Sequence, residues 1–160
     1  MTFEIAPLVP ELWCTDFEES MKFYTESIGF EVVQQRGHDP HAYISLNQAQ
    51  IMLAHWTIDG GWEPWHPKPM ERPFGRGINF QFLVHNVQGL YDRICSIGIE
   101  PFVDIHDAEV WKTGCMDTRR QFIVLDPDGY LLRFAQSVGM RAVTDTDHKR
   151  LNQKYGTRSS

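Results

Sequence analysis

The sequence predicts an α+β protein made of two tandem βαβββ units, and three observations lead to this prediction. A strand, a one-faced helix and a returning strand occur twice, the second time about seventy residues after the first. Both helical segments, 16–29 and 86–98, start at a capping residue and end at a glycine. A hairpin at 121–134 closes the second unit. Each unit is expected to cover one face of its sheet with a helix, so that the other faces meet across a shared groove.

The first unit is predicted at residues 8–56 and begins with a strand at 8–15. Asp16 follows in the N-cap position, and two glutamates stand in the first helical turn, where carboxylates interact favourably with the helix dipole. The helix is expected to end at Gly29, because a helix end before an extended segment favours a residue that tolerates left-handed φ. Three further strands are predicted, at 30–34, 42–46 and 50–56.

The second unit is predicted at residues 77–136 and repeats this order. Its first strand leads to Asn86 as the second N-cap, and the helix that follows is expected to end at Gly98. The remaining strands are predicted at 99–103, near 109–112, and in the two arms of the hairpin.

Two segments lie outside the units. Residues 57–76 contain four prolines and two tryptophans, which is typical of a stiff aromatic connector rather than a flexible linker. Loops of this length within a compact domain are often functional. Residues 137–160 form a polar C-terminal tail, expected as a short helix or a frayed end without chemistry.

The hairpin carries one unexpected residue. Its turn, residues 126–129, reads Asp-Pro-Asp-Gly, in which Asp accepts backbone hydrogen bonds, Pro presets φ and Gly takes positive φ. Alternation after the turn separates Arg133 from Leu132 and Phe134, which are expected on the helix side of the sheet. An arginine in so apolar a strand is a candidate functional residue.

Composition limits the classes of function. At 160 residues, with 42% hydrophobic and 22% charged residues, the chain is typical of one globular domain. No apolar run approaches the ~20 residues that span a bilayer, and no signal pattern opens the chain, so we expect a cytoplasmic protein without membrane contact. Three cysteines without pair spacing suit a reducing compartment. The net charge of −6 and the scattered Lys and Arg residues argue against a nucleic-acid partner.

Four motifs in this order resemble the vicinal oxygen chelate superfamily, which includes glyoxalase I, extradiol dioxygenases, fosfomycin-resistance transferases and bleomycin resistance proteins. The motifs are VPELWCTD at 9–16, FYxxxIGFE at 23–31, GINFQFLV at 77–84 and DPDGYLLRF at 126–134. The pattern is most similar to bleomycin-resistance-like members. This resemblance implies paired βαβββ units and a homodimer that sequesters a small molecule.

The resemblance also identifies four positions at which enzymes of the superfamily hold a divalent metal. In this sequence they fall on Val9, Met52, Asn79 and Arg133. Valine supplies no ligand, methionine is a poor ligand for hard cations, and arginine is a permanent cation. At roughly 4–5 Å such a cation would repel a metal by several kcal/mol. The resemblance therefore implies a lost chelate site, with no metal, no other cofactor and no assigned catalytic residue.

The groove is instead expected to bind a planar or amphipathic ligand, bleomycin-like or otherwise aromatic. Alternation makes the groove candidates Glu11, Trp13, Asn79, Gln81 and Arg133, and Trp56, Trp62, Trp65 and Trp111 could stack over the ligand. Arg133 would either bind a carboxylate or carbonyl of the ligand or pair with Glu11 across the groove.

Two other functions fit the same fold. In the first, a divergent metal-dependent lyase, isomerase or dioxygenase uses Glu11, His55 or His85 as displaced ligands. In the second, the chain is a protein-interaction subunit without a small ligand. His38 and His41 could clasp a metal, although solvation is the ordinary role of histidines in such a polar loop.

Overall fold

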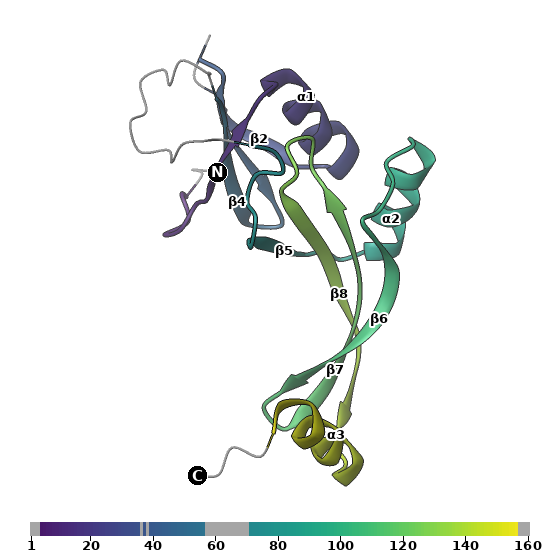
Figure 1. Cartoon of the computed structure of the whole chain (residues 1–160). Helices are drawn as coiled ribbons and strands as arrows, with labels where there is room; N and C mark the ends of the chain where they lie inside the picture. The colour runs from purple at the N-terminus through teal and green to yellow at the C-terminus, as the bar shows by residue number, and fades with distance from the viewer. Residues whose placement is uncertain (1–3, 36, 38, 57–70, 157–160) are drawn as a thin grey trace.

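Two four-stranded sheets with the same strand order form the molecule (Figure 1). The computed structural model describes residues 4–35, 37, 39–56 and 71–156. Sheet A has the order β1-β4-β3-β2, from β1 (Glu11–Cys14), β2 (Glu31–Gln35), β3 (His41–Leu46) and β4 (Ala49–His55). Sheet B has the order β5-β8-β7-β6, from β5 (Asn79–Leu83), β6 (Val103–Lys112), β7 (Cys115–Leu125) and β8 (Leu131–Ala142). In each sheet the first strand pairs in parallel with the last, and the other pairs are antiparallel. The predicted α+β class and the duplication are confirmed.

The helices begin at the predicted caps. The side chain of Asp16 accepts a hydrogen bond from the Glu19 N–H at 2.9 Å and starts α1 (Phe17–Lys22), which continues as a π-helical segment, η1 (Phe23–Ile28). Asn86 accepts from the Gly89 N–H at 2.9 Å and starts α2 (Val87–Ser96). Gly29 ends η1 in the left-handed region with φ 98°.

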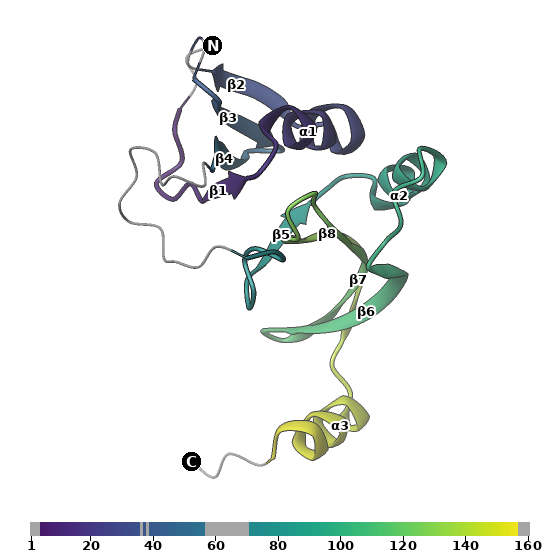
Figure 2. The same cartoon turned by 45° about the horizontal axis from the view of Figure 1, so that its top comes forward.

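One hydrophobic core lies on the helix side of both sheets. Figure 2 shows α1 and α2 next to each other on this side, where Arg93 of α2 donates a hydrogen bond to the Ile28 carbonyl of η1. The ring of Phe30 meets that of Phe82 edge to face with centroids 5.3 Å apart, which joins the first unit to the second. Phe82 in turn stacks on Phe134 at 5.4 Å. The helix sides of the two sheets thus pack together within one chain. We call the opposite side of each sheet its open face.

The hairpin turn forms a seam between the two units. Thr15, after β1, donates to Asp128 from its backbone N–H at 3.0 Å and from its hydroxyl at 2.7 Å. The Tyr24 hydroxyl donates to Asp126 at 2.8 Å. Asp126 also accepts from the backbone N–H groups of Asp128 and Tyr130. The turn therefore closes the hairpin and also holds the first unit.

The described end of the predicted connector, residues 71–76, packs on the same turn. Phe74 is buried, and its N–H donates to the Asp128 carbonyl at 2.8 Å. Gly129 has φ +89°, and a Cβ there would lie 2.4 Å from the Cβ of Pro73. Glycine is required at this position both for the turn and for the close approach of the neighbouring segment.

Sheet B extends well beyond the core. The sequence predicts separate strands at 99–103 and 109–112, whereas β6 is continuous over Val103–Lys112. β8 runs past residue 136 to Ala142, and α3 (Asp145–Tyr155) follows it, at the end of the molecule opposite the first unit (Figures 1 and 2). We call the distal parts of β6–β8, residues 107–119 and 137–142, together with α3 the extension.

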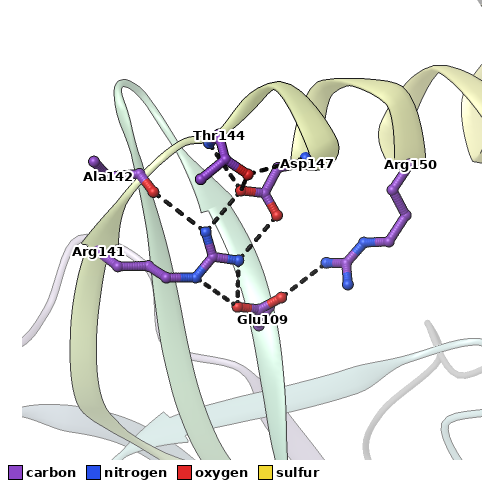
Figure 3. A network of polar contacts seen from close by, with 6 residues as sticks. All are labelled: Glu109, Arg141, Ala142, Thr144, Asp147 and Arg150. Atoms are coloured by element: carbon purple, nitrogen blue, oxygen red, sulfur yellow. Dashed lines mark hydrogen bonds and ion pairs between the residues drawn. The ribbon is translucent and has the colours of Figure 1, made fainter.

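Ionic contacts attach α3 to this part of the sheet (Figure 3). Thr144 and Asp147 form a capping box that starts the helix. Arg141 of β8 donates to both carboxylate oxygens of Asp147, at 2.7 and 2.9 Å, and to Glu109 of β6 at 2.6 and 3.0 Å. Arg150 of α3 reaches the other Glu109 oxygen at 3.0 Å. Ion pairs thus attach α3 to the extended part of sheet B.

Candidate functional site

The open face of sheet B carries a patch of nine residues centred on Arg133. Residues directly opposite one another on paired strands point to the same face. Across β5, β8 and β7 the rows of this face are Asn79, Leu131 and Leu125, then Gln81, Arg133 and Ile123, then Leu83, Ala135 and Gln121. The alternate residues Phe82, Leu132, Phe134 and Phe122 are buried in the core on the other side. We call these nine residues the Arg133 patch.

The patch contains a cation and no acid. The Arg133 Nε is buried without a hydrogen-bond partner, whereas its two terminal nitrogens are not buried in this way. Within the described chain, no carboxylate pairs with Arg133, although Arg72, Arg119, Arg120, Arg141 and Arg150 each contact one. Of the polar neighbours, Asn79 and Gln81 are exposed. The positive charge of Arg133 is therefore uncompensated inside this part of the fold.

One edge of the patch is fixed by a histidine. His106 of β6 contacts the Asp104 carbonyl through Nδ1 at 2.8 Å and the Gln121 amide nitrogen through Nε2 at 3.1 Å. A neutral imidazole that donates from Nδ1 to the carbonyl has Nε2 free to accept from the amide. This arrangement orients Gln121, which sequence alternation along β7 could have placed beside Arg133.

Further along the same face, an acid is already neutralised. Asp117 is buried, accepts a hydrogen bond from the Ser137 hydroxyl, and forms ion pairs with Lys112 at 2.8 Å and Arg119 at 3.0 Å. Hydrogen bonding to Lys112, then to Ser137 and Arg119, holds the pKa of the Asp117 carboxyl well below its usual range. Arg119 is thus committed to Asp117, which makes Arg133 the cation available on this face.

The open face of sheet A is acidic and aromatic. Glu11 and Trp13 of β1 lie on it, in register with Met52 and Ala54 of β4. The Glu11 carboxylate lies 3.6 Å from Nε2 of His41, whose ring meets Tyr43 at 5.5 Å. Glu11 therefore contacts His41 of its own sheet, and no hydrogen bond or ion pair joins it to Arg133 among the described residues.

The predicted tryptophans do not gather on one face. Trp111 pairs with Met116 on the helix side of sheet B, opposite to Arg133, and its ring meets His148 of α3 at 5.2 Å. Trp56 follows β4 and its ring meets Phe74 at 6.5 Å. Trp62 and Trp65 lie outside the described residues, as does His38. Of the predicted aromatic residues, the structure places Trp13 on an open face and removes Trp111 from it.

The predicted metal positions do not form a donor set for a metal. Met52, Asn79 and Arg133 lie on β4, β5 and β8. Val9 precedes β1, beside Pro10, whose carbonyl accepts from the Met52 N–H at 2.8 Å. An alkyl group, a thioether, an amide and a guanidinium do not suit a hard divalent cation.

The displaced ligands of a divergent metalloenzyme are not brought together either. Glu11 contacts His41, whereas His55 is in register with Cys14 on the helix side of sheet A. His85 lies beyond the end of β5 and is exposed. In the described ranges, no three His, Cys, Asp or Glu side chains come close enough to hold a metal ion. No described helix is long and apolar enough to cross a membrane.

Comparisons with known proteins agree with this fold. A family model described as "Glyoxalase/Bleomycin resistance protein/Dioxygenase superfamily" matches residues 5–134. Curated bleomycin resistance proteins from Geobacillus stearothermophilus and Staphylococcus aureus are 27% identical over 138 residues, covering 81% of this chain and 96% of each relative. TioX from Micromonospora sp. ML1 shares the fold with a TM-score of 0.61 at 19% identity, over 83% of this chain and 99% of TioX. A protein from the mobile metagenome of V. Pseudocholerae does so with a TM-score of 0.63 at 16% identity, over 87% and 100%.

The family match ends at residue 134, inside β8, so residues 137–142 and α3 of the extension lie beyond it, whereas both sheets with the Arg133 patch lie largely within it. A match over this much of the sequence, together with two sheets of identical topology, establishes the family. The chain belongs to the glyoxalase/bleomycin resistance protein/dioxygenase superfamily.

Proposed function

We propose that this chain is a metal-free, bleomycin-resistance-like protein that sequesters a planar or amphipathic small molecule on the open faces of its sheets. One observation carries the proposal: where a metalloenzyme of this fold would need a ligand on β8, the chain has Arg133, at the centre of a patch without acids. The similarity to bleomycin resistance proteins supports the same conclusion. Binding would use Trp13 on sheet A and the patch on sheet B.

The proposed binding unit is a homodimer in the cytoplasm. Leu83, Met140 and Leu125 on the open side of sheet B have exposed fractions of 60%, 67% and 39%, and a second copy would cover them. The open face of sheet A, which carries Trp13, would then lie opposite the Arg133 patch of the second copy. A two-fold dimer that sets sheet A of one copy against sheet B of the other would contain two identical sites.

The test combines oligomeric state, metal content and ligand binding. Light scattering after gel filtration should give a dimer, elemental analysis should give far less than one metal per chain, and bleomycin or planar aromatic compounds should quench tryptophan fluorescence. Leu83→Asp should separate the dimer and abolish quenching. Val32→Asp is the matched control, because Val32 is 47% exposed and points to the helix side of sheet A.

Three results would contradict the proposal. Stoichiometric Zn, Ni, Mn or Fe would favour the divergent metalloenzyme. A stable monomer that still binds the ligand would exclude the paired arrangement. A dimer that binds none of the compounds would favour a protein-interaction subunit.

A further inference from the structure

Among the arginines that the structure describes, Arg133 alone has a side chain without a hydrogen-bond or ion-pair partner in the protein. Every other described guanidinium donates to a carboxylate or a backbone carbonyl: Arg72, Arg76, Arg93, Arg119, Arg120, Arg141 and Arg150. The Arg133 Nε is buried and unbonded, so burying this nitrogen has a cost that no described contact offsets. Arg133 is thus the exception among the described arginines, and a buried polar group without a partner calls for an explanation such as a bound ligand or ion.

The surroundings of Arg133 define the ligand that fits. Gln81 lies in the same row on β5, and Asn79 one row away, so two exposed amides can donate to an anion bound at the guanidinium. Leu125, Leu131 and Leu83 provide apolar surface in the adjacent rows. The patch thus offers one positive charge, neutral donors beside it and apolar contact around them.

We infer that the Arg133 patch selects ligands that carry one carboxylate on an apolar or aromatic body. This inference rests on the proposed function and names the ligand class of the same site. The planar guanidinium presents paired N–H groups that match the two oxygens of a carboxylate. One uncompensated cation matches one negative charge, whereas a phosphate dianion would require a second cation. Arg119 cannot provide it, because it is already paired with Asp117. The same charge repels cationic ligands.

The experiment compares two probes of nearly equal shape, 2-naphthoate and 2-naphthamide, by isothermal titration calorimetry on the full chain. We expect 2-naphthoate to bind roughly tenfold more tightly or better, because a hydrogen bond to a charged group is stronger than one between neutral groups. Arg133→Leu should remove this difference by weakening 2-naphthoate alone. Arg133→Lys should retain part of it, because the ammonium keeps the charge and loses the paired donors.

Arg120→Gln is the matched control. It removes one positive charge from β7, but Arg120 pairs with Asp107 on the helix side of sheet B and does not touch the patch. The preference for 2-naphthoate should therefore persist in this variant. Circular dichroism and gel filtration with light scattering on each variant report its fold and its oligomeric state.

Each alternative result has one meaning. Equal binding of both probes, unchanged in Arg133→Leu, would overturn the inference and leave the proposed sequestering function intact. If the wild-type dimer bound neither probe, the result would count against both the inference and the proposed function. Conversion of Arg133→Leu to a monomer would overturn the inference as well, because Arg133 would then hold an acid of a second copy rather than a ligand.

Discussion

Two regions of this chain use aspartate in opposite ways. At the seam, Asp126 is buried among a tyrosine hydroxyl and backbone N–H groups, and no cation of the described residues pairs with it. Burial raises the pKa of its carboxyl to about 6, although these hydrogen bonds act to lower it. In the extension, Asp147 is held by the Arg141 guanidinium and the Thr144 cap, which keep the pKa of that carboxyl well below its usual range. The partner, rather than the residue type, sets the charge that the fold favours.

The seam and the extension thus differ in the interactions that stabilise them. The seam fixes one unit to the other through buried donors and acceptors, whose loss is expected to affect the whole fold. The extension is attached by ion pairs whose arginines are largely exposed, although Asp147 itself is buried, and ion pairs in contact with water are individually weak. Mutations in the seam should therefore lower the stability of the whole protein, and moderate acid should change that stability through Asp126. Mutations in the extension should open only the extension.

The largest effect is expected from Asp128→Ala in the seam. Asp128 is buried and accepts from the Thr15 N–H, from the Thr15 hydroxyl and from the Arg72 Nε at 2.9 Å. Removing the carboxylate leaves these donors without a partner, so we expect the free energy of unfolding to fall by about 2–4 kcal/mol. Urea denaturation at fixed protein concentration measures the change.

Asp92→Ala is the control for this comparison. Asp92 on α2 accepts one exposed hydrogen bond, from Gln88, and its loss should change the free energy of unfolding by no more than about 0.5 kcal/mol. Equal effects of the two substitutions would show that the turn is an ordinary hairpin turn rather than a joint between the units.

A smaller effect is expected from the titration of Asp126. Its folded pKa of about 6 lies above the ordinary value of 3.8, so the folded state binds the proton more tightly than the unfolded state. The stabilisation from protonation is complete below pH 3.8 and is lost as pH rises through 6. This group alone should stabilise the protein by about 1 kcal/mol on going from pH 7 to pH 5.

The isosteric variant Asp126→Asn isolates this contribution. It keeps an acceptor for the backbone N–H groups and cannot ionise, so the wild type should gain stability relative to the variant as pH falls from 7 to 5. Thermal unfolding of both proteins across this range gives the difference. A constant difference would mean that Asp126 is not protonated near pH 6.

The sequence predicts those features that depend on near neighbours. The Asp16 and Asn86 caps, the turn at 126–129 and the face of Arg133 each follow from residues within one turn or one strand, and the structure contains them. The seam could not be predicted, because Asp128 binds Thr15 and Asp126 binds Tyr24 across more than a hundred positions. Nothing in the local pattern of a turn aspartate indicates a distant partner.

The candidate site shows the same limit. Gln81 and Asn79 are found by alternation on β5, whereas His106 reaches the patch through a bulge in the pairing of β6 with β7. Trp111 was expected beside a ligand because tryptophan suits stacking, but the register of a longer β6 turns it toward α3. The end of β8 lacks buried residues, and the polar residues of 144–160 follow it, so the sequence predicts a tail there rather than a strand held by charge.

The smallest global effect is expected from Arg141→Gln in the extension. Arg141 joins Asp147 of α3 to Glu109 of β6, and the variant removes the ion pair that fixes the start of the helix, leaving only Arg150 paired with Glu109 (Figure 3). We expect α3 to open locally, with trypsin cleaving after Lys149 and Arg150 several-fold faster, while the free energy of unfolding changes by less than about 0.5 kcal/mol. Because the pKa of Asp147 lies below 3.8, the wild-type contact should persist from pH 7 to pH 5, where Asp126 titrates.

Arg120→Gln, which loses the ion pair with Asp107 without touching α3, should be cleaved like the wild type. If Arg141→Gln instead destabilised the whole protein as strongly as Asp128→Ala, the extension would belong to the same cooperative unit as the seam. The contrast between an aspartate held by neutral donors and one held by an arginine would then not describe how this fold is held.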